Sequence, residues 1–174
     1  EYALKVANKE GSFIGGLYVT PENAIHADAP LEEFRNRCKT AAVPGDLAVE
    51  QGNITRLVYE RSFWADLVVL RLSHPPPLFF FGRLRSGLRT LIRRCTTPLL
   101  VVPPSAQPDP QTALLAYGGG AKADEALFLA TYLANRWGIE LHVVTIDRKG
   151  LDGNKLIDRA RLYLTRHGVP DAHY

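Results

Sequence analysis

The sequence of 174 residues contains no methionine and only two cysteines. Cys38 and Cys95 are too few for a disulfide scaffold and lack the C-x-x-C spacing of a zinc site. No apolar run approaches the roughly 20 residues that cross a bilayer, and none follows a basic start as in a secretory signal. We therefore expect a cytoplasmic chain from a reducing compartment.

Acidic residues are missing from one long stretch of the chain. Between Leu67 and Pro108 there is no aspartate or glutamate, whereas the same stretch holds six arginines. The net charge of the whole chain is only +3, so its basicity is local. A local basic patch favours a contact with an anion over general nucleic-acid binding, and we expect no nucleic-acid partner.

Short segments rich in Val, Leu and Ile alternate with amphipathic segments, several of which end at glycine. Strands are predicted at residues 13–19, 46–50, 66–70, 98–102, 112–117 and 139–146. Helices are predicted at residues 2–9, 30–42, 54–62, 84–94, 122–137 and 154–167. Continuously apolar strands suit burial on both faces, which predicts an α/β fold with a parallel sheet sandwiched between helices. We expect the first four strands in one sheet, with 66–70 and 98–102 as neighbours joined by a right-handed crossover through the basic helix.

The proline-rich residues 105–110 predict a linker between a first unit, residues 1–104, and a second unit, residues 111–174. Short matches repeat across this linker. Asn8 and Gly11 recur as Asn135 and Gly138 at an offset of 127, and the Val-Pro pair that begins at residue 43 recurs at residue 169. The two offsets, 127 and 126, agree to within one residue and predict two copies of one unit.

The offset also predicts that both copies are partial. The first copy would begin before Glu1 and lack its first strand, and the second would be barely half a unit. An empty central slot in the sheet would expose unpaired backbone groups. Either residues are absent from this excerpt of a longer chain, or residues 112–117 fill the slot.

The order of these segments resembles the universal stress protein family. Residues 65–70, a loop, a basic helix and residues 97–102 resemble the second half of such a domain. Residues 124–138 and 141–144 resemble the first half. The resemblance implies a Rossmann-like sheet of five strands, dimerisation through the last strand, and, in some members only, ATP or AMP bound at the carboxyl ends of the strands.

The nucleotide-binding members of the family share a glycine-rich loop that this chain does not match. Arg71 and His74 stand at its two leading glycines, Arg85 and Ser86 at its final pair, and three prolines from residue 75 remove amide donors. The family's aspartate at the end of the first strand corresponds to Gly118. No cofactor is therefore predicted, and ATP or AMP is the alternative.

Two interpretations of the basic segment stay open. In one, Arg83, Arg85 and Ser86 hold an anion at a helix start. In the other, which we favour, Arg85, Arg89 and Arg93 form a solvated helix face opposite an apolar one made of Leu84, Leu88, Leu91 and Ile92.

A second candidate for a phosphate site is the triglycine loop (Gly118, Gly119 and Gly120), which precedes a predicted helix and is at least as well explained as a plain turn. Phe79, Phe80 and Phe81 predict either a contact surface or packing over the sheet end, with neither favoured. The five histidines show no spacing that would assemble a catalytic triad or a metal site.

The resulting expectation is a non-enzymatic regulatory or stress-response module that acts through dimerisation and partner contact, with no catalytic or metal residues. A parent membrane transporter that carries it as a cytoplasmic domain is compatible with the sequence. The alternative is a protein that binds ATP or AMP, with at most slow hydrolysis, at Arg83, Arg85, Ser86 and the triglycine loop. We expect a symmetric homodimer through the apolar edge Leu99–Val102.

Overall fold

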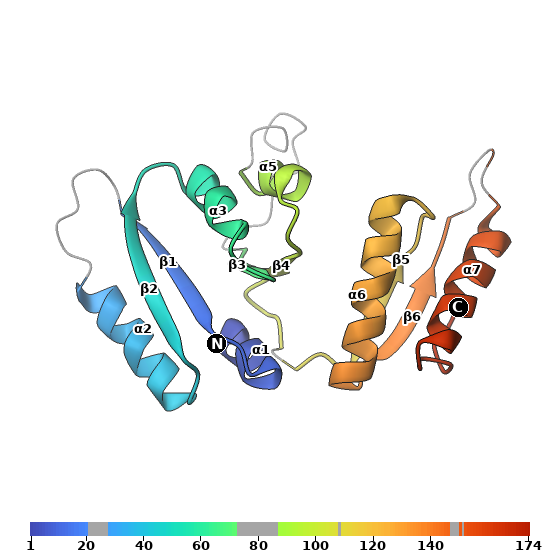
Figure 1. Cartoon of the computed structure of the whole chain (residues 1–174), viewed down its shortest axis with the longest axis horizontal. Helices are drawn as coiled ribbons and strands as arrows, with labels where there is room; N and C mark the ends of the chain where they lie inside the picture. The colour runs from blue at the N-terminus through green and yellow to red at the C-terminus, as the bar shows by residue number, and fades with distance from the viewer. Residues whose placement is uncertain (21–27, 73–86, 108, 147–149, 151) are drawn as a thin grey trace. The chain divides into compact units, whose positions relative to one another are not determined.

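Helices and strands alternate along the whole chain, which confirms the α/β class (Figure 1). The structure is a computed structural model that describes residues 1–20, 28–72, 87–107, 109–146, 150 and 152–174. The chain divides into two compact units, Glu1–Pro108 (unit 1) and Asp109–Tyr174 (unit 2).

Unit 1 is built from parallel strand pairs with helices between them. Its described elements are α1 (Tyr2–Glu10), β1 (Ile14–Thr20), α2 (Asp28–Thr40), β2 (Gly45–Gln51), α3 (Ile54–Ser62), β3 (Val68–Arg71), α5 (Gly87–Arg94) and β4 (Leu99–Val102). β1 is parallel to β2, and β3 is parallel to β4. The predicted neighbourhood of β3 and β4 is confirmed, with α5 between them in sequence.

Two sequence-based expectations about the sheet are wrong. Within the described residues of unit 1 the strands form two separate ladders, β1–β2 and β3–β4, and not one sheet of four. The alternative in which residues 112–117 fill the empty slot also fails, because Thr112–Ala116 pairs with a strand of unit 2. That pairing places Leu115 of β5 beside Leu141 and Val143 of β6 in one buried cluster with residues of α6 and α7, so apolar burial within unit 2 favours it.

Unit 2 is a parallel strand pair with helices on one face. Its described elements are β5 (Thr112–Ala116), α6 (Ala121–Trp137), β6 (Glu140–Val144) and α7 (Gly153–Arg166). One buried cluster joins the two strands to α6 and α7. It contains Leu115 of β5, Tyr117 just after β5, and Leu141 and Val143 of β6. Successive side chains of a strand point to opposite faces of the sheet. Leu114, which precedes Leu115 on β5, therefore points away from the buried cluster and is 71% exposed.

In each unit one helix ends at a glycine and is joined to the next helix by an asparagine side chain. α1 ends at Gly11 and α6 at Gly138, each with the positive φ that glycine adopts without strain. The Asn8 side chain donates a hydrogen bond to the Ala41 carbonyl, 3.3 Å, just beyond α2. Likewise Asn135 donates to the His167 carbonyl, 2.8 Å, just beyond α7. Each asparagine therefore ties the end of one helix to the end of the next.

No helix within the described ranges is both long and apolar enough to span a membrane.

Candidate functional site

Several residues of the predicted anion site lie outside the described residues. These are Arg83, Arg85 and Ser86, as well as His74, the three prolines from residue 75, and Phe79, Phe80 and Phe81. Arg71 is described and is an exposed residue at the end of β3. An anion site in this segment therefore stays a prediction.

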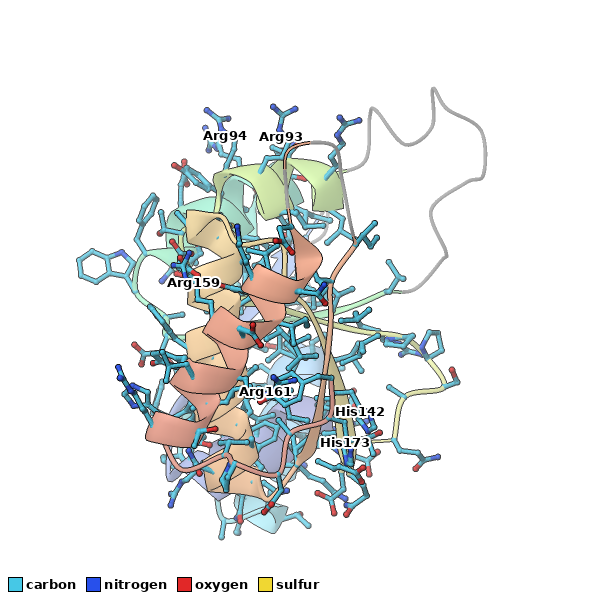
Figure 2. The ribbon with its side chains drawn as sticks, turned by 90° about the vertical axis from the view of Figure 1, so that its right-hand side faces the viewer. Arg93, Arg94, His142, Arg159, Arg161 and His173 are labelled. Carbon is cyan, nitrogen blue, oxygen red and sulfur yellow. The ribbon has the colours of Figure 1, made fainter. Side chains whose placement is uncertain are left out.

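The described part of the basic helix, α5, has a narrower apolar face than expected. Leu91 is buried, as predicted, whereas Ile92 is 62% exposed. Arg93 and Arg94 project from α5 away from the ribbon (Figure 2). The Arg94 guanidinium lies 5.6 Å from the centre of the Tyr59 ring on α3, within the range of a cation–π contact. These positions favour a solvated basic face with one arginine packed over a neighbouring helix.

The triglycine loop connects β5 to α6, and only one of its glycines is required by the backbone. Gly119 has a φ of +73°, and a Cβ there would collide with Leu156 of α7. A Cβ at Gly118 or Gly120 would meet open space. Gly120 is the N-cap of α6, and no side chain caps it. The geometry therefore meets the needs of a close-packed turn without requiring a bound phosphate.

A closed polar network lies directly beside this loop. The buried Tyr117 hydroxyl donates a hydrogen bond to Asp124 Oδ1, 2.7 Å, in the first turn of α6. Arg159 of α7 donates to Asp124 Oδ2, 2.6 Å. An acidic side chain already occupies the amino end of α6, where an anionic ligand would bind best. The network thus links Tyr117 to α6 and α6 to α7 beside the loop.

Burial, helped by the hydrogen bond to Asp124, raises the pKa of Tyr117 to about 12. The hydroxyl therefore stays protonated at neutral pH and is not a general base.

This shift predicts a pH dependence of stability. An unfolded tyrosine loses its proton near its ordinary pKa of 10, whereas folded Tyr117 keeps it until about pH 12. The contribution is complete below pH 10 and is lost as the pH rises towards 12. Between pH 9 and pH 11 we expect the free energy of unfolding to fall by about 1.4 kcal/mol more in the wild type than in Tyr117→Phe. Denaturant titrations at both pH values measure this, and equal slopes in the two proteins would contradict it.

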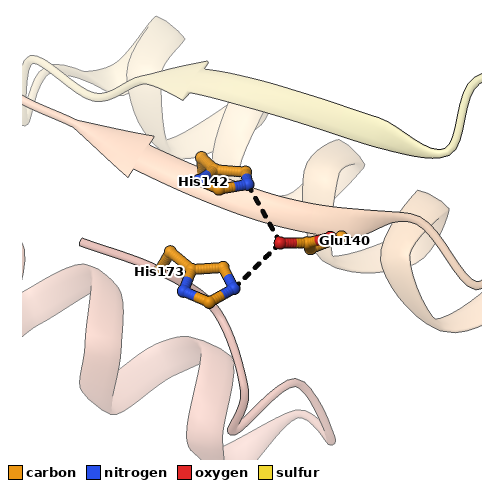
Figure 3. Close-up of side chains that lie close together, drawn as sticks. All are labelled: Glu140, His142 and His173. Carbon is orange, nitrogen blue, oxygen red and sulfur yellow. Dashed lines mark ion pairs between the residues drawn. The ribbon is translucent and has the colours of Figure 1, made fainter.

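A second polar cluster lies on the face of the β5–β6 sheet opposite the buried cluster of unit 2 (Figure 3). It consists of Glu140 and His142 of β6 and His173 near the end of the chain. Glu140 Oε1 is 3.2 Å from His142 Nε2 and 3.0 Å from His173 Nε2. The two imidazole rings stack with their centres 4.7 Å apart.

Sequence analysis missed this cluster, because the spacing of the five histidines does not indicate which of them lie close together. One signal was present, since Glu140 and His142 are two residues apart in a predicted strand and so share a face. Nothing in the sequence indicated that His173 would join them. Its position depends on a single parallel bridge to His142, and α7 separates the two residues in the sequence. The triglycine loop, the other predicted site that the structure describes, does not lie near this cluster. The loop follows the carboxyl end of β5, whereas Glu140 is at the amino end of the parallel strand β6.

Comparison with known proteins gives a match in structure only. No family model matches the chain, and no curated protein matches it. A universal stress protein from Archaeoglobus fulgidus DSM 4304 matches with a TM-score of 0.72 and 16% identity, over 99% of this chain and 70% of that one. A functionally unknown protein from Pseudomonas aeruginosa PAO1 matches with a TM-score of 0.66 and 13% identity, over 98% of this chain and 66% of that one. The chain therefore has an α/β fold like that of a universal stress protein.

Proposed function

We propose that the chain is a non-enzymatic regulatory module of the universal stress protein type, which acts through dimerisation and contact with a partner. The observation that carries this proposal is the open edge of β4. In the described residues β4 pairs only with β3. Its four residues, Leu99–Val102, are all apolar and only half-buried. An apolar strand with an unpaired edge is a template for pairing with another strand.

The direction of the backbone hydrogen bonds identifies the groups at this edge. Val68 donates to the Pro98 carbonyl, 3.0 Å, and Leu72 donates to the Val102 carbonyl, 2.9 Å. Backbone groups of successive residues point to opposite sides of a strand, so every second residue of β4 faces β3. The amides of Leu99 and Val101 therefore face the open edge, where a second copy of the chain would bind as an antiparallel strand.

The closed network at the triglycine loop supports the non-enzymatic part of the proposal. The Asp124 carboxylate accepts hydrogen bonds from both Tyr117 and Arg159, and the Tyr117 hydroxyl stays protonated at neutral pH, so the side chains of the network are engaged with one another. Catalysis by a general base needs a group that can exchange its proton near the working pH. The network instead serves packing.

A tandem arrangement of two related units is part of the same proposal. It is supported by the matched asparagine bridges, Asn8 to Ala41 and Asn135 to His167, whose donors are 127 residues apart and whose acceptors are 126 residues apart, as in the sequence repeats. The bonds that follow them also correspond, because Val43 donates to Cys38 and Val169 donates to Leu164. On this proposal, the segment from α1 to β2 corresponds to the segment from α6 to the end of the chain.

The test of dimerisation is Val101→Pro. Proline removes the outward amide but not a bond to β3, and it is tolerated in edge strands. We expect the wild type to be a dimer at tens of micromolar and the variant to dissociate at least about tenfold more readily, because each copy loses one hydrogen bond worth roughly 1 kcal/mol. Sedimentation velocity measures both. Val101→Thr, which alters the side chain and keeps the amide, should remain dimeric.

Two outcomes would contradict the proposal. A monomeric wild type, or a folded Val101→Pro variant that dimerises as tightly as the wild type, would reject pairing through β4. Saturable ATP or AMP binding in calorimetry, with turnover of ATP, would favour the nucleotide-binding alternative instead.

A further inference from the structure

The polar cluster on the face of the β5–β6 sheet opposite the buried cluster of unit 2 is assembled by strand geometry. Glu140 and His142 are two residues apart on β6 and so point to the same face. His173 is the bridge partner of His142 in a parallel pairing, which places the two side chains next to each other on that face. The residue between Glu140 and His142, Leu141, faces the opposite side and is buried in the core.

The backbone around the cluster is fixed on both sides of the bridge. Val143 donates a hydrogen bond to the His173 carbonyl, 2.8 Å, and His173 donates to the Leu141 carbonyl, 2.9 Å. The last residue, Tyr174, is held as well, because the Arg161 guanidinium lies 4.6 Å from the centre of its ring. The three polar side chains thus project from an anchored backbone.

We propose that Glu140, His142 and His173 form a binding site for a zinc-class divalent transition-metal ion. Their ligand atoms all lie within 4.8 Å of one another. Zinc binds imidazole nitrogen and carboxylate oxygen at about 2.0–2.2 Å, so two ligands of one tetrahedral ion are about 3.4 Å apart. The observed separations from Glu140 Oε1, 3.2 Å to His142 Nε2 and 3.0 Å to His173 Nε2, are slightly shorter than that spacing, so a small movement of these exposed side chains would admit an ion.

The donor set selects the class of metal. Two imidazoles and one carboxylate suit zinc, cobalt and nickel, whereas magnesium and calcium prefer a shell made of oxygen. Imidazole binds a metal in its neutral form, so the Glu140 carboxylate would supply the one negative charge among the three ligands and would offset part of the charge of a divalent ion. The side chains are 45–57% exposed, so an ion can enter from solvent and water can complete its coordination.

The site would also couple metal binding to the end of the chain. His142 belongs to the sheet, whereas His173 lies beyond α7 and meets the sheet through one bridge. A metal bound by both would act as a second link across that bridge. Hydrogen exchange at the amides of Val143 and His173 should therefore slow when the metal binds.

The experiment is calorimetric titration of the full chain, prepared without a histidine tag, with zinc chloride. We expect one zinc ion per chain at micromolar concentrations and no binding of magnesium. His142→Ala and His173→Ala should each weaken the affinity by at least about tenfold, since loss of a group that merely orients a ligand already costs that much. The matched control is His167→Ala, which removes a histidine that contacts Tyr163 and lies outside the cluster.

A second readout does not depend on the variants. Cobalt bound by these ligands with few waters gives a strong visible absorption, whereas hydrated cobalt is weakly coloured. The proposal is supported if cobalt develops this band in the wild type and zinc removes it. It is overturned if zinc fails to bind, if the wild type shows only the spectrum of hydrated cobalt, or if His142→Ala and His173→Ala bind zinc as tightly as His167→Ala.

Discussion

Leu164→Ala will destabilise unit 2 by about 3–4 kcal/mol, the largest effect that we expect from a single substitution. Leu164 lies on α7, is fully buried, and packs in the same cluster as Leu115 of β5 and Leu141 of β6. Truncation removes buried apolar surface and leaves a cavity at the centre of the only cluster found among the described residues of this unit. Hydrogen exchange of the α6 and α7 amides, measured by mass spectrometry, reports this loss separately from unit 1.

The same helix supplies the control for this prediction. Leu162 is two residues away on α7 and is 53% exposed. Leu162→Ala makes the same chemical change and should cost less than about 0.5 kcal/mol, because it creates no cavity. Equal effects of the two variants would mean that the described core does not hold α7 in place.

Asp124→Ala should cost about 2–3 kcal/mol, because two groups depend on this one carboxylate. The Tyr117 hydroxyl would be buried without an acceptor, and Arg159 would lose its ion pair. A buried polar group without a hydrogen-bond partner lowers stability by about 1–3 kcal/mol, whereas the loss of a surface ion pair usually lowers it by less than about 1 kcal/mol. Denaturant unfolding at neutral pH measures the change.

An exposed aspartate on α7 provides the comparison for Asp124. Asp158 pairs with Arg161 at 3.0 Å, and both side chains are more than half exposed. Asp158→Ala should therefore change stability by less than about 0.5 kcal/mol. Adding Tyr117→Phe to Asp124→Ala should recover part of the loss, because it removes the unsatisfied hydroxyl. If Asp124→Ala and Asp158→Ala have equal effects, the network is not the stabilising contact that we infer.

The elements of the fold were predictable because each is encoded locally. Hydrophobic periodicity and terminal glycines predicted α3 at its observed residues, Ile54–Ser62, and most other elements within two or three residues of their observed ends. The parallel pairing of β3 and β4 was also predictable, because consecutive strands joined by a helical crossover usually become neighbours. Local signals therefore accounted for the α/β class.

The arrangement of the sheets and the polar sites was harder to predict, because it depends on contacts distant in sequence. Nothing near Asp124 indicated that Arg159 would pair with it, 35 residues later. The approach of His173 to Glu140 likewise depends on how the chain returns to the sheet after α7. The triglycine loop suggested either a phosphate site or a plain turn, and in the structure only Gly119 has a backbone conformation that requires glycine. Composition cannot distinguish a ligand loop from a crowded turn.

The buried residues of unit 2 form one cluster on one face of the β5–β6 sheet, and the polar cluster at Glu140 lies on the other face, so a ligand bound there would add to the stability of the same folded unit. A ligand that binds only the folded form adds RT ln(1 + [L]/Kd), which reaches about 2.7 kcal/mol at a hundred times Kd. If the cluster at Glu140 binds zinc, the folded population of unit 2 would then rise and fall with the free zinc around it.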